Sequence, residues 1–269
     1  MTGAMAYRMI GAEVLKLRRN RGVMAFAMVL MFAVVILYYG VAAIEHASNP
    51  LKNHAAGGLT GFQNGVRAMA DFIGLLTAIL IGAEAGTSDR ASGVFRSLVV
   101  TGRSRLALFA VRVPAAIIVW LALAVVSFGM ILLATFLFAP DSSTAVHHLH
   151  GSGSIPTLGL ILQSAGWLTL TGAVLVACTV GIGSLTGSRA VTLTAAIGWE
   201  VVASNLLLNA GFLGSARRGI LSAALDNLAP ISGVRPNVTM AEGVAVIVLI
   251  VWTAAAIALG AWRTKTLDA

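Results

Sequence analysis

The sequence predicts an all-α polytopic membrane protein, and three observations support this fold class. Residues 23–44 form 22 positions without a charge, and similar uncharged runs occur at 113–140, 151–188 and 243–262. The chain is 58% hydrophobic and only 10% charged, whereas soluble domains are about a quarter charged. Its mean hydropathy is +0.91. A bilayer core needs roughly 20 apolar helical residues, so these runs have the length of membrane spans.

Six spans account for these runs, and 269 residues leave no room for a large soluble domain besides them. We therefore predict one transmembrane domain over residues 1–269. The third and fourth spans exceed the bilayer minimum and are expected to tilt, kink or project into water. The predicted spans are 23–44, 66–87, 109–138, 157–184, 190–210 and 241–262.

Lysine and arginine near the span ends predict the orientation, because cytoplasmic loops are enriched in both. An even number of spans puts both termini on one side. Thirteen basic residues fall on that side, and five fall on the other: Lys52, Arg67, Arg217, Arg218 and Arg235. Both termini are therefore expected in the cytoplasm, with the protein in the plasma (inner) membrane.

The net charge of +8 does not indicate nucleic-acid binding in a chain this apolar. We expect the basic residues to meet anionic lipid headgroups. Cys178 is the single cysteine, so the chain forms no internal disulfide. The first apolar stretch is longer than the core of a signal peptide and is interpreted as a retained span.

The segment 5–20 precedes the first span and is predicted to be a short basic amphipathic helix lying in the membrane interface. Met9 and Leu15 lie off its apolar stripe. A simple topology anchor is the alternative. The stripe consists of Tyr7, Ile10, Val14 and Leu17, and the opposite face carries Arg8, Lys16 and Arg19.

The loop 87–112, between spans two and three, predicts a second amphipathic helix. Ser88 or Asp89 can cap its N-terminus, and Gly102 is placed to end it. Membrane-surface packing is the alternative role. Its apolar face would hold Val94, Phe95, Leu98 and Val99, and its other face Arg90, Gly93, Arg96 and Ser97.

The run from Asp89 to Arg105 resembles the first cytoplasmic loop of ABC-2-type transporter permeases. That pattern has an acidic residue, Gly-Thr four positions on, a leucine-containing helix, and Pro-x-Ser-Arg. Asp89, Gly93 and the pair Ser104-Arg105 match it, whereas Val94 and Gly102 replace the usual threonine and proline. The upstream run Glu13-x-x-Lys16-Leu17-Arg18-Arg19 is similar to the family's N-terminal elbow helix.

The resemblance implies the transmembrane subunit of an ATP-driven exporter of amphiphilic substrates. The loop would be a coupling helix that docks on a separate ATP-binding subunit, and two permease chains and two ATPase chains would form the working unit. ATP and Mg²⁺ would bind to the ATPase, and this chain would bind no cofactor. The implied coupling residues are Asp89, Gly93, Val94, Phe95, Arg96, Leu98, Gly102, Ser104 and Arg105.

The sequence has no ATPase or other enzyme motif of its own. Its one Lys-Ser/Thr pair is Lys265-Thr266, and Thr264 stands where a P-loop needs glycine. It also lacks His-Glu-x-x-His and Gly-x-Ser-x-Gly. The cluster His147-His148-Leu-His150 lies in an outer loop without a fixed fourth ligand, so we expect no functional metal site.

Glu200 lies about halfway along span five, where a carboxylate costs roughly 2.5–3.5 kcal/mol, and Asn205 and Asn209 follow it. It either faces a substrate path for a cationic or hydroxylated substrate, together with Asn205, or forms an interhelical hydrogen bond. Packing or capping is expected for Asp71 and Glu84.

Three further features complete the sequence predictions. The pairs Gly82/Gly86 and Gly183/Gly187 permit close helix approach. The outer segment 211–240 allows one amphipathic helix over about 215–228. Two other function classes stay open: a transporter driven by an ion gradient, which would need linked acids inside the membrane, and a scaffold or immunity protein.

Overall fold

A computed structural model describes residues 3–50, 55–91, 93, 104–139, 155–231 and 238–266. Every regular element in these ranges is helical. Six helical runs among them are long and apolar enough to cross a membrane: Arg21–Ser48, Gly58–Arg90, Arg105–Leu137, Leu158–Thr186, Arg189–Asn209 and Glu242–Thr266. The prediction of an all-helical, multi-pass membrane protein is therefore confirmed.

The outer surfaces of these helices are apolar, as a lipid-facing surface requires. Large hydrophobic side chains stay more than half exposed on three different helices, among them Ile36, Leu37, Val125, Leu133, Ile247 and Ile250.

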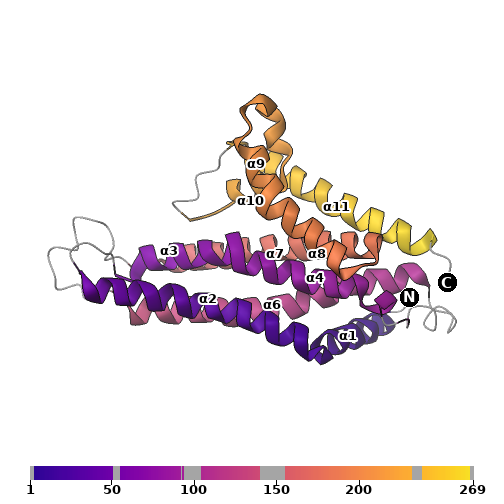
Figure 1. The fold of residues 1–269 in the computed structure, drawn as a ribbon, viewed down its shortest axis with the longest axis horizontal. Coiled ribbons are helices and arrows are strands. Elements are labelled where there is room, and N and C mark those ends of the chain that lie inside the picture. The colour runs from indigo at the N-terminus through magenta and orange to yellow at the C-terminus, as the bar shows by residue number, and fades with distance from the viewer. Residues whose placement is uncertain are drawn as a thin grey trace.

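Figure 1 shows α2, α3, α4, α6 and α7 running side by side along the long axis of the molecule. Helices α8, α9 and α11 diverge from this bundle, and α10 lies between them and it. Both chain ends lie at the same end of the molecule, which we call the terminal end. The Arg105 Nη1 atom, which donates to the Lys265 carbonyl at 3.4 Å, joins the start of α6 to the end of α11 there.

The predicted helix before the first span is present as α1 (Gly3–Arg19). It ends at Asn20, whose side chain accepts a hydrogen bond from Val23 N and so caps α2 (Arg21–Ser48). The side that faces the protein keeps most of the predicted stripe, because Leu17 is buried and Ile10 and Val14 are partly buried, but it differs at two positions. Met9, placed off the stripe, is buried with Leu108 and Val111 of α6, whereas Tyr7 is 79% exposed. The position of α6 decides which face is covered, and periodicity within α1 contains no information about α6.

The second span is one helical run made of α3 (Gly58–Ala68), the π-helical turn η1 (Met69–Ile73) and α4 (Gly74–Ala91). It begins eight residues before the predicted boundary at 66. The third span, α6 (Arg105–Leu137), begins where Ser104 Oγ accepts from Ala107 N. Its predicted start at 109 was also late, because the last polar residues before a span can belong to the same helix.

The fourth span, α7 (Leu158–Thr186), is the centre of the bundle, and glycines let two helices approach it. A Cβ on Gly86 of α4 would lie 3.0 Å from the Gly183 Cα atom, and a Cβ on Gly260 of α11 (Glu242–Thr266) would lie 2.7 Å from the Gly181 carbonyl oxygen. Gly187, by contrast, ends α7 in the left-handed conformation. The sequence pairs Gly82/Gly86 and Gly183/Gly187 thus pointed to a real contact, but Gly187 has a different role.

The fifth span consists of α8 (Arg189–Ile197), a second π-helical turn, η3 (Gly198–Ala203), and α9 (Ser204–Asn209). The chain then forms the 3-10 segment η4 (Gly211–Gly219) and the short helix α10 (Leu221–Asn227). The predicted single helix over 215–228 is wrong, because Ile220 is extended and separates the two elements.

Helix α10 reaches alongside the spans instead of staying beyond their ends. The indole Nε1 of Trp167 donates to the Leu225 carbonyl at 2.9 Å, and that of Trp252 donates to the Gly219 carbonyl at 2.8 Å. Trp167 follows the first residue of α7 by nine positions, which corresponds to about 14 Å of helix. The segment between spans five and six therefore contributes side chains to the interior of the molecule.

Candidate functional site

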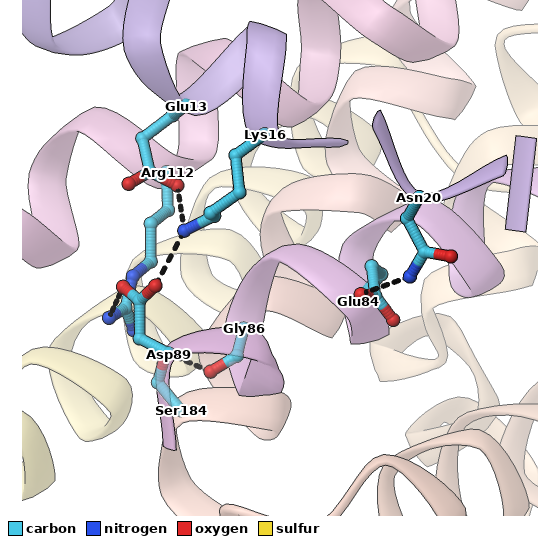
Figure 2. Close-up of polar contacts among 8 residues, drawn as sticks. All are labelled: Glu13, Lys16, Asn20, Glu84, Gly86, Asp89, Arg112 and Ser184. Carbon is cyan, nitrogen blue, oxygen red and sulfur yellow. Dashed lines mark hydrogen bonds and ion pairs between the residues drawn. The ribbon is translucent and has the colours of Figure 1, made fainter. Parts of the chain in front are cut away.

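An ion-pair cluster joins three helices at the terminal end, as Figure 2 shows. Asp89, in the last turn of α4, accepts from Lys16 Nζ of α1 at 2.6 Å and from Arg112 Nη2 of α6 at 2.5 Å. Asp89 is 2% exposed and Arg112 is 1% exposed. Lys16 also pairs with Glu13, one turn earlier on α1.

Helix geometry places these groups where they can meet. Lys16 lies in the last turn of α1, and Arg112 lies two turns into α6, where its side chain points back toward the N-terminal end of that helix. The buried Asp89–Arg112 pair stays stable only while both partners are present, because removing either one leaves a charge in an apolar interior. The cluster therefore fixes α1, α4 and α6 to each other beside the two ends of the loop 92–103.

A second polar contact lies on the neighbouring turn of α4. The Glu84 carboxylate accepts from Asn20 Nδ2 at 2.7 Å (Figure 2). It also pairs with Arg189 Nη1 at 3.1 Å. Glu84 thus ties the junction of α1 and α2 to the first residue of α8. Ser184 Oγ, which donates to the Gly86 carbonyl, adds α7 to the same region. Three regions far apart in sequence therefore converge here: the α1–α2 junction, the end of α4, and the α7–α8 junction.

The structure describes part of the predicted coupling loop. Gly93 has a φ of +70°, a conformation that favours glycine, and its N–H donates to the Arg90 carbonyl. Ser104 and Arg105 are the cap and first residue of α6. Leu17 is buried, and Arg18 and Arg19 are exposed. The predicted residues Val94, Phe95, Arg96, Leu98 and Gly102 lie outside the described residues.

Sequence reasoning missed two members of this region, Arg112 and Asn20. Arg112 fell inside the predicted span 109–138, where an arginine requires an acidic or polar partner. Asp89, the acidic residue next to that span in the sequence, was the natural candidate. Asn20 gave no sequence signal beyond ending a helix.

A different site lies along the spans, where a polar cavity of about 260 Å³ brings three carboxylates together. Asp71 comes from the π-helical turn η1, Glu200 from the π-helical turn η3, and Asp226 from α10. Such turns occur frequently at functional sites, since the extra residue re-aims a side chain. Asn205, the other predicted path residue, also lines this cavity.

Glu200 has the least compensated environment of the three acids. Its residue is 7% exposed, and among the described residues no hydrogen bond or ion pair reaches its carboxylate. The interhelical hydrogen bond weighed from the sequence is therefore not seen in this part of the chain. Asp71, by contrast, pairs with Arg67 Nε at 3.1 Å. The amide of Asn205 donates to the Val201 carbonyl of its own helix at 2.9 Å.

Two hydroxyls in the wall of the same cavity are also unsatisfied within the described ranges. Thr171 Oγ1 and Ser222 Oγ are buried and have no partner there. Burial raises the pKa of the Asp226 carboxyl to about 6; Asp71 raises it further, and Arg67 opposes the shift. This cavity thus offers donors and acceptors that the described protein does not use.

An apolar cavity of about 350 Å³ adjoins the polar one. It lies between α7, α8, α10 and α11, and Glu200 and Leu175 line both cavities. Trp199 and Trp252 form part of its wall, with ring centroids 5.4 Å apart. Glu200 therefore stands at the boundary between a polar and an apolar space.

Within the described ranges, no group of three or more histidine, cysteine, aspartate or glutamate side chains has a geometry that could hold a metal ion. The cluster His147-His148-Leu-His150 lies outside those ranges. Comparison with models of known protein families found no match, and no curated protein matched the chain. The likeness to ABC-2-type permeases therefore depends on residues 13–19 and 89–105.

Proposed function

We propose that this protein is the membrane-spanning permease subunit of an ATP-driven exporter of the ABC-2 type. It would dimerise with a second copy or a homologous permease and would couple to two separate ATP-binding subunits that hold ATP and Mg²⁺. Both termini and the loop 92–103 would face the cytoplasm. Membrane lipids would surround the chain, and nucleic acid would not be a partner.

The Asp89 cluster is the observation that favours this function most. A coupling loop has to pass the motion of an ATPase to the spans, so its ends must be firmly attached to them. Asp89 and Arg112 attach the end of α4 to the start of α6, and Lys16 adds α1. A loop that only rested on the membrane surface would have no need of a buried ion pair linking three helices.

Co-purification from the native host in mild detergent tests the class of function. We expect a P-loop ATPase in equimolar amount, and its absence from the intact assembly would refute the proposal. The expected partner distinguishes this function from a scaffold or immunity protein, which would stimulate no ATPase.

Two variants test the role of the loop within that assembly. We expect Arg105→Glu, and disruption of the Val94/Leu98 face, to uncouple ATP hydrolysis from transport without preventing membrane insertion. Arg218→Glu is the matched control, because it makes the same charge change in the exposed segment η4. Coupled transport at the normal rate in both loop variants would argue against docking.

A transporter driven by an ion gradient is the second candidate, and the acidic cavity favours it. From the sequence, Glu200 alone lay near the middle of a span, but the fold adds Asp71 and Asp226 to the same cavity. Linked acids inside a membrane protein are typical of proton relays. Such a transporter would use a pH gradient in place of an ATPase.

Reconstitution in liposomes separates the two candidates. An exporter of the ABC type moves its substrate only when the ATPase and ATP are present, and a pH gradient alone has no effect. Uptake driven by a pH gradient in the absence of any ATPase, and lost in Glu200→Gln, would favour the second candidate.

A further inference from the structure

The two adjoining cavities form one amphipathic space. The polar cavity holds Asp71, Glu200 and Asp226, and the apolar cavity is walled by Cys178, Trp199 and Trp252. A ligand that filled both would need a polar group at one end and a hydrocarbon body at the other. Glu200, which lines both spaces, would lie at the junction of those two parts.

The charge of the polar cavity selects the sign of the ligand. Among the described residues that line it, Arg67 is the one basic residue, and it is already paired with Asp71. Glu200 and Asp226 remain without an ion-pair partner among the described residues. The cavity therefore favours a cation over an anion or a neutral group, because opposite charges attract.

Packing alone does not account for these side chains. Unpaired polar groups are costly inside a membrane protein, and Glu200, Thr171 and Ser222 are all left unsatisfied by the described chain. Trp199 Nε1, in the wall of the apolar cavity, is a fourth such group. A bound cationic nitrogen would compensate the carboxylate of Glu200, whereas the Trp199 N–H is a donor and would need an acceptor instead.

A bare metal ion does not fit the same observations. The carboxylates lack the convergent geometry of a metal site, as noted above for the described residues. An inorganic cation would also leave the adjoining apolar cavity of about 350 Å³ without a function. The two tryptophan rings beside the Glu200 carboxylate are, in contrast, a favourable surface for the apolar body of an organic cation.

We propose that this space binds an amphiphile with a cationic head group, with the head at Glu200 and Asp226 and the hydrocarbon chain between Leu175, Cys178, Trp199 and Trp252. That the ligand is also the transported substrate rests on the proposed transport function. The binding itself requires neither ATP nor a partner subunit.

Binding of radiolabelled decyltrimethylammonium to the purified full-length protein in nonionic detergent tests this assignment. We expect saturable binding that decyl sulfate, which has the same chain and the opposite charge, does not compete. Glu200→Gln should weaken binding by about tenfold or more, because an interaction with a buried charge is lost. Glu242→Gln, an exposed carboxylate at the start of α11, is the matched control and should bind normally.

A second variant tests the apolar part and does not alter a buried polar group. Ala255 lines the apolar cavity from an exposed position on α11. Ala255→Trp should fill the cavity and weaken decyltrimethylammonium binding at least severalfold, with little effect on tetramethylammonium. This variant remains informative if Glu200→Gln fails to fold.

Three results would overturn the assignment: equal competition by decyl sulfate, unchanged binding in Glu200→Gln together with Ala255→Trp, or no saturable binding at all. The outcome is independent of the exporter proposal. A protein that co-purifies with a P-loop ATPase but does not bind the cation refutes the substrate class alone. A protein that binds the cation but has no ATPase partner refutes the exporter alone.

Discussion

The Asp89 cluster predicts a large difference between a substitution of its buried carboxylate and a substitution of the partly exposed Lys16. Asp89→Asn takes the charge from a carboxylate that is 2% exposed and removes its ion pairs to Lys16 and to Arg112, which is 1% exposed. Lys16→Met leaves the Asp89–Arg112 pair in place and removes the pairs of Lys16 to Asp89 and Glu13, and the Lys16 side chain is 35% exposed. Solvent therefore screens the second interaction and not the first.

The expected magnitudes follow from that difference in burial. Breaking a buried ion pair on one side costs about 3–5 kcal/mol, whereas a partly exposed pair contributes about 0.2–1 kcal/mol. The double variant Asp89→Leu/Arg112→Met should recover most of the lost stability, because apolar residues of similar size can replace a buried pair at little cost.

The buried Cys178 provides the assay. It is the single cysteine in the sequence, so the rate at which a thiol-reactive dye labels it on heating in detergent reports loss of tertiary structure. The single variants Asp89→Leu and Arg112→Met complete a double-mutant cycle with the double variant, in which the two positions should show strong coupling. Equal losses in Asp89→Asn and Lys16→Met, or a double variant as unstable as the sum of its single variants, would refute this reasoning.

Three further predictions also concern stability on heating in detergent. The first two use the same labelling assay, and the third uses tryptophan fluorescence, because thiols react as thiolates and label too slowly at pH 4. Gly86→Ala should destabilise the protein by about 1–3 kcal/mol, because the new Cβ would lie 2.8 Å from the Val180 carbonyl oxygen. Gly129→Ala is the control and should not destabilise it, because no atom lies within 4 Å of the new Cβ. Equal effects of the two substitutions would show that α4 and α7 are not so close. Arg189→Met should destabilise by less than about 1 kcal/mol, because its side chain is 41% exposed, and a larger loss would mean that Glu84 depends on it. Asp226→Asn should be more stable than the wild type at pH 8 by about 1–3 kcal/mol and should lose this advantage at pH 4. The reason is that the pKa of Asp226, raised to about 6, means that the fold favours the protonated acid. A stability difference independent of pH would contradict this.

The sign of the last prediction follows from proton linkage. The Asp226 carboxyl binds its proton more tightly in the folded chain than in the unfolded chain, whose pKa lies near the usual 3.8. The wild type therefore loses stability as the pH rises from about 4 to about 6. The amide introduced by Asp226→Asn cannot ionise, so that variant is not subject to this loss.

The membrane spans could be predicted from sequence because hydrophobic length is a local property. The run 157–184 differs by only a few residues from α7 (Leu158–Thr186), since a helix has to satisfy its own backbone across the bilayer. Glu200 was likewise identified from its place in an apolar run. Its burial, and the cavity that it shares with Asp226 of α10, depend on helix packing that no local pattern predicts.

The amino-acid sequence by itself determined that this is an all-helical, multi-pass membrane protein, and it marked Asp89 and Glu200 as residues that need an explanation. Only the tertiary structure decided that Asp89 binds Lys16 and Arg112, and that Asp71, Glu200 and Asp226 share one cavity. The physical reason is that hydrophobicity and helix length act within one segment, whereas ion pairs and cavities form between segments. Their partners are selected by how the helices pack, through close approaches such as that of Gly86 to Gly183.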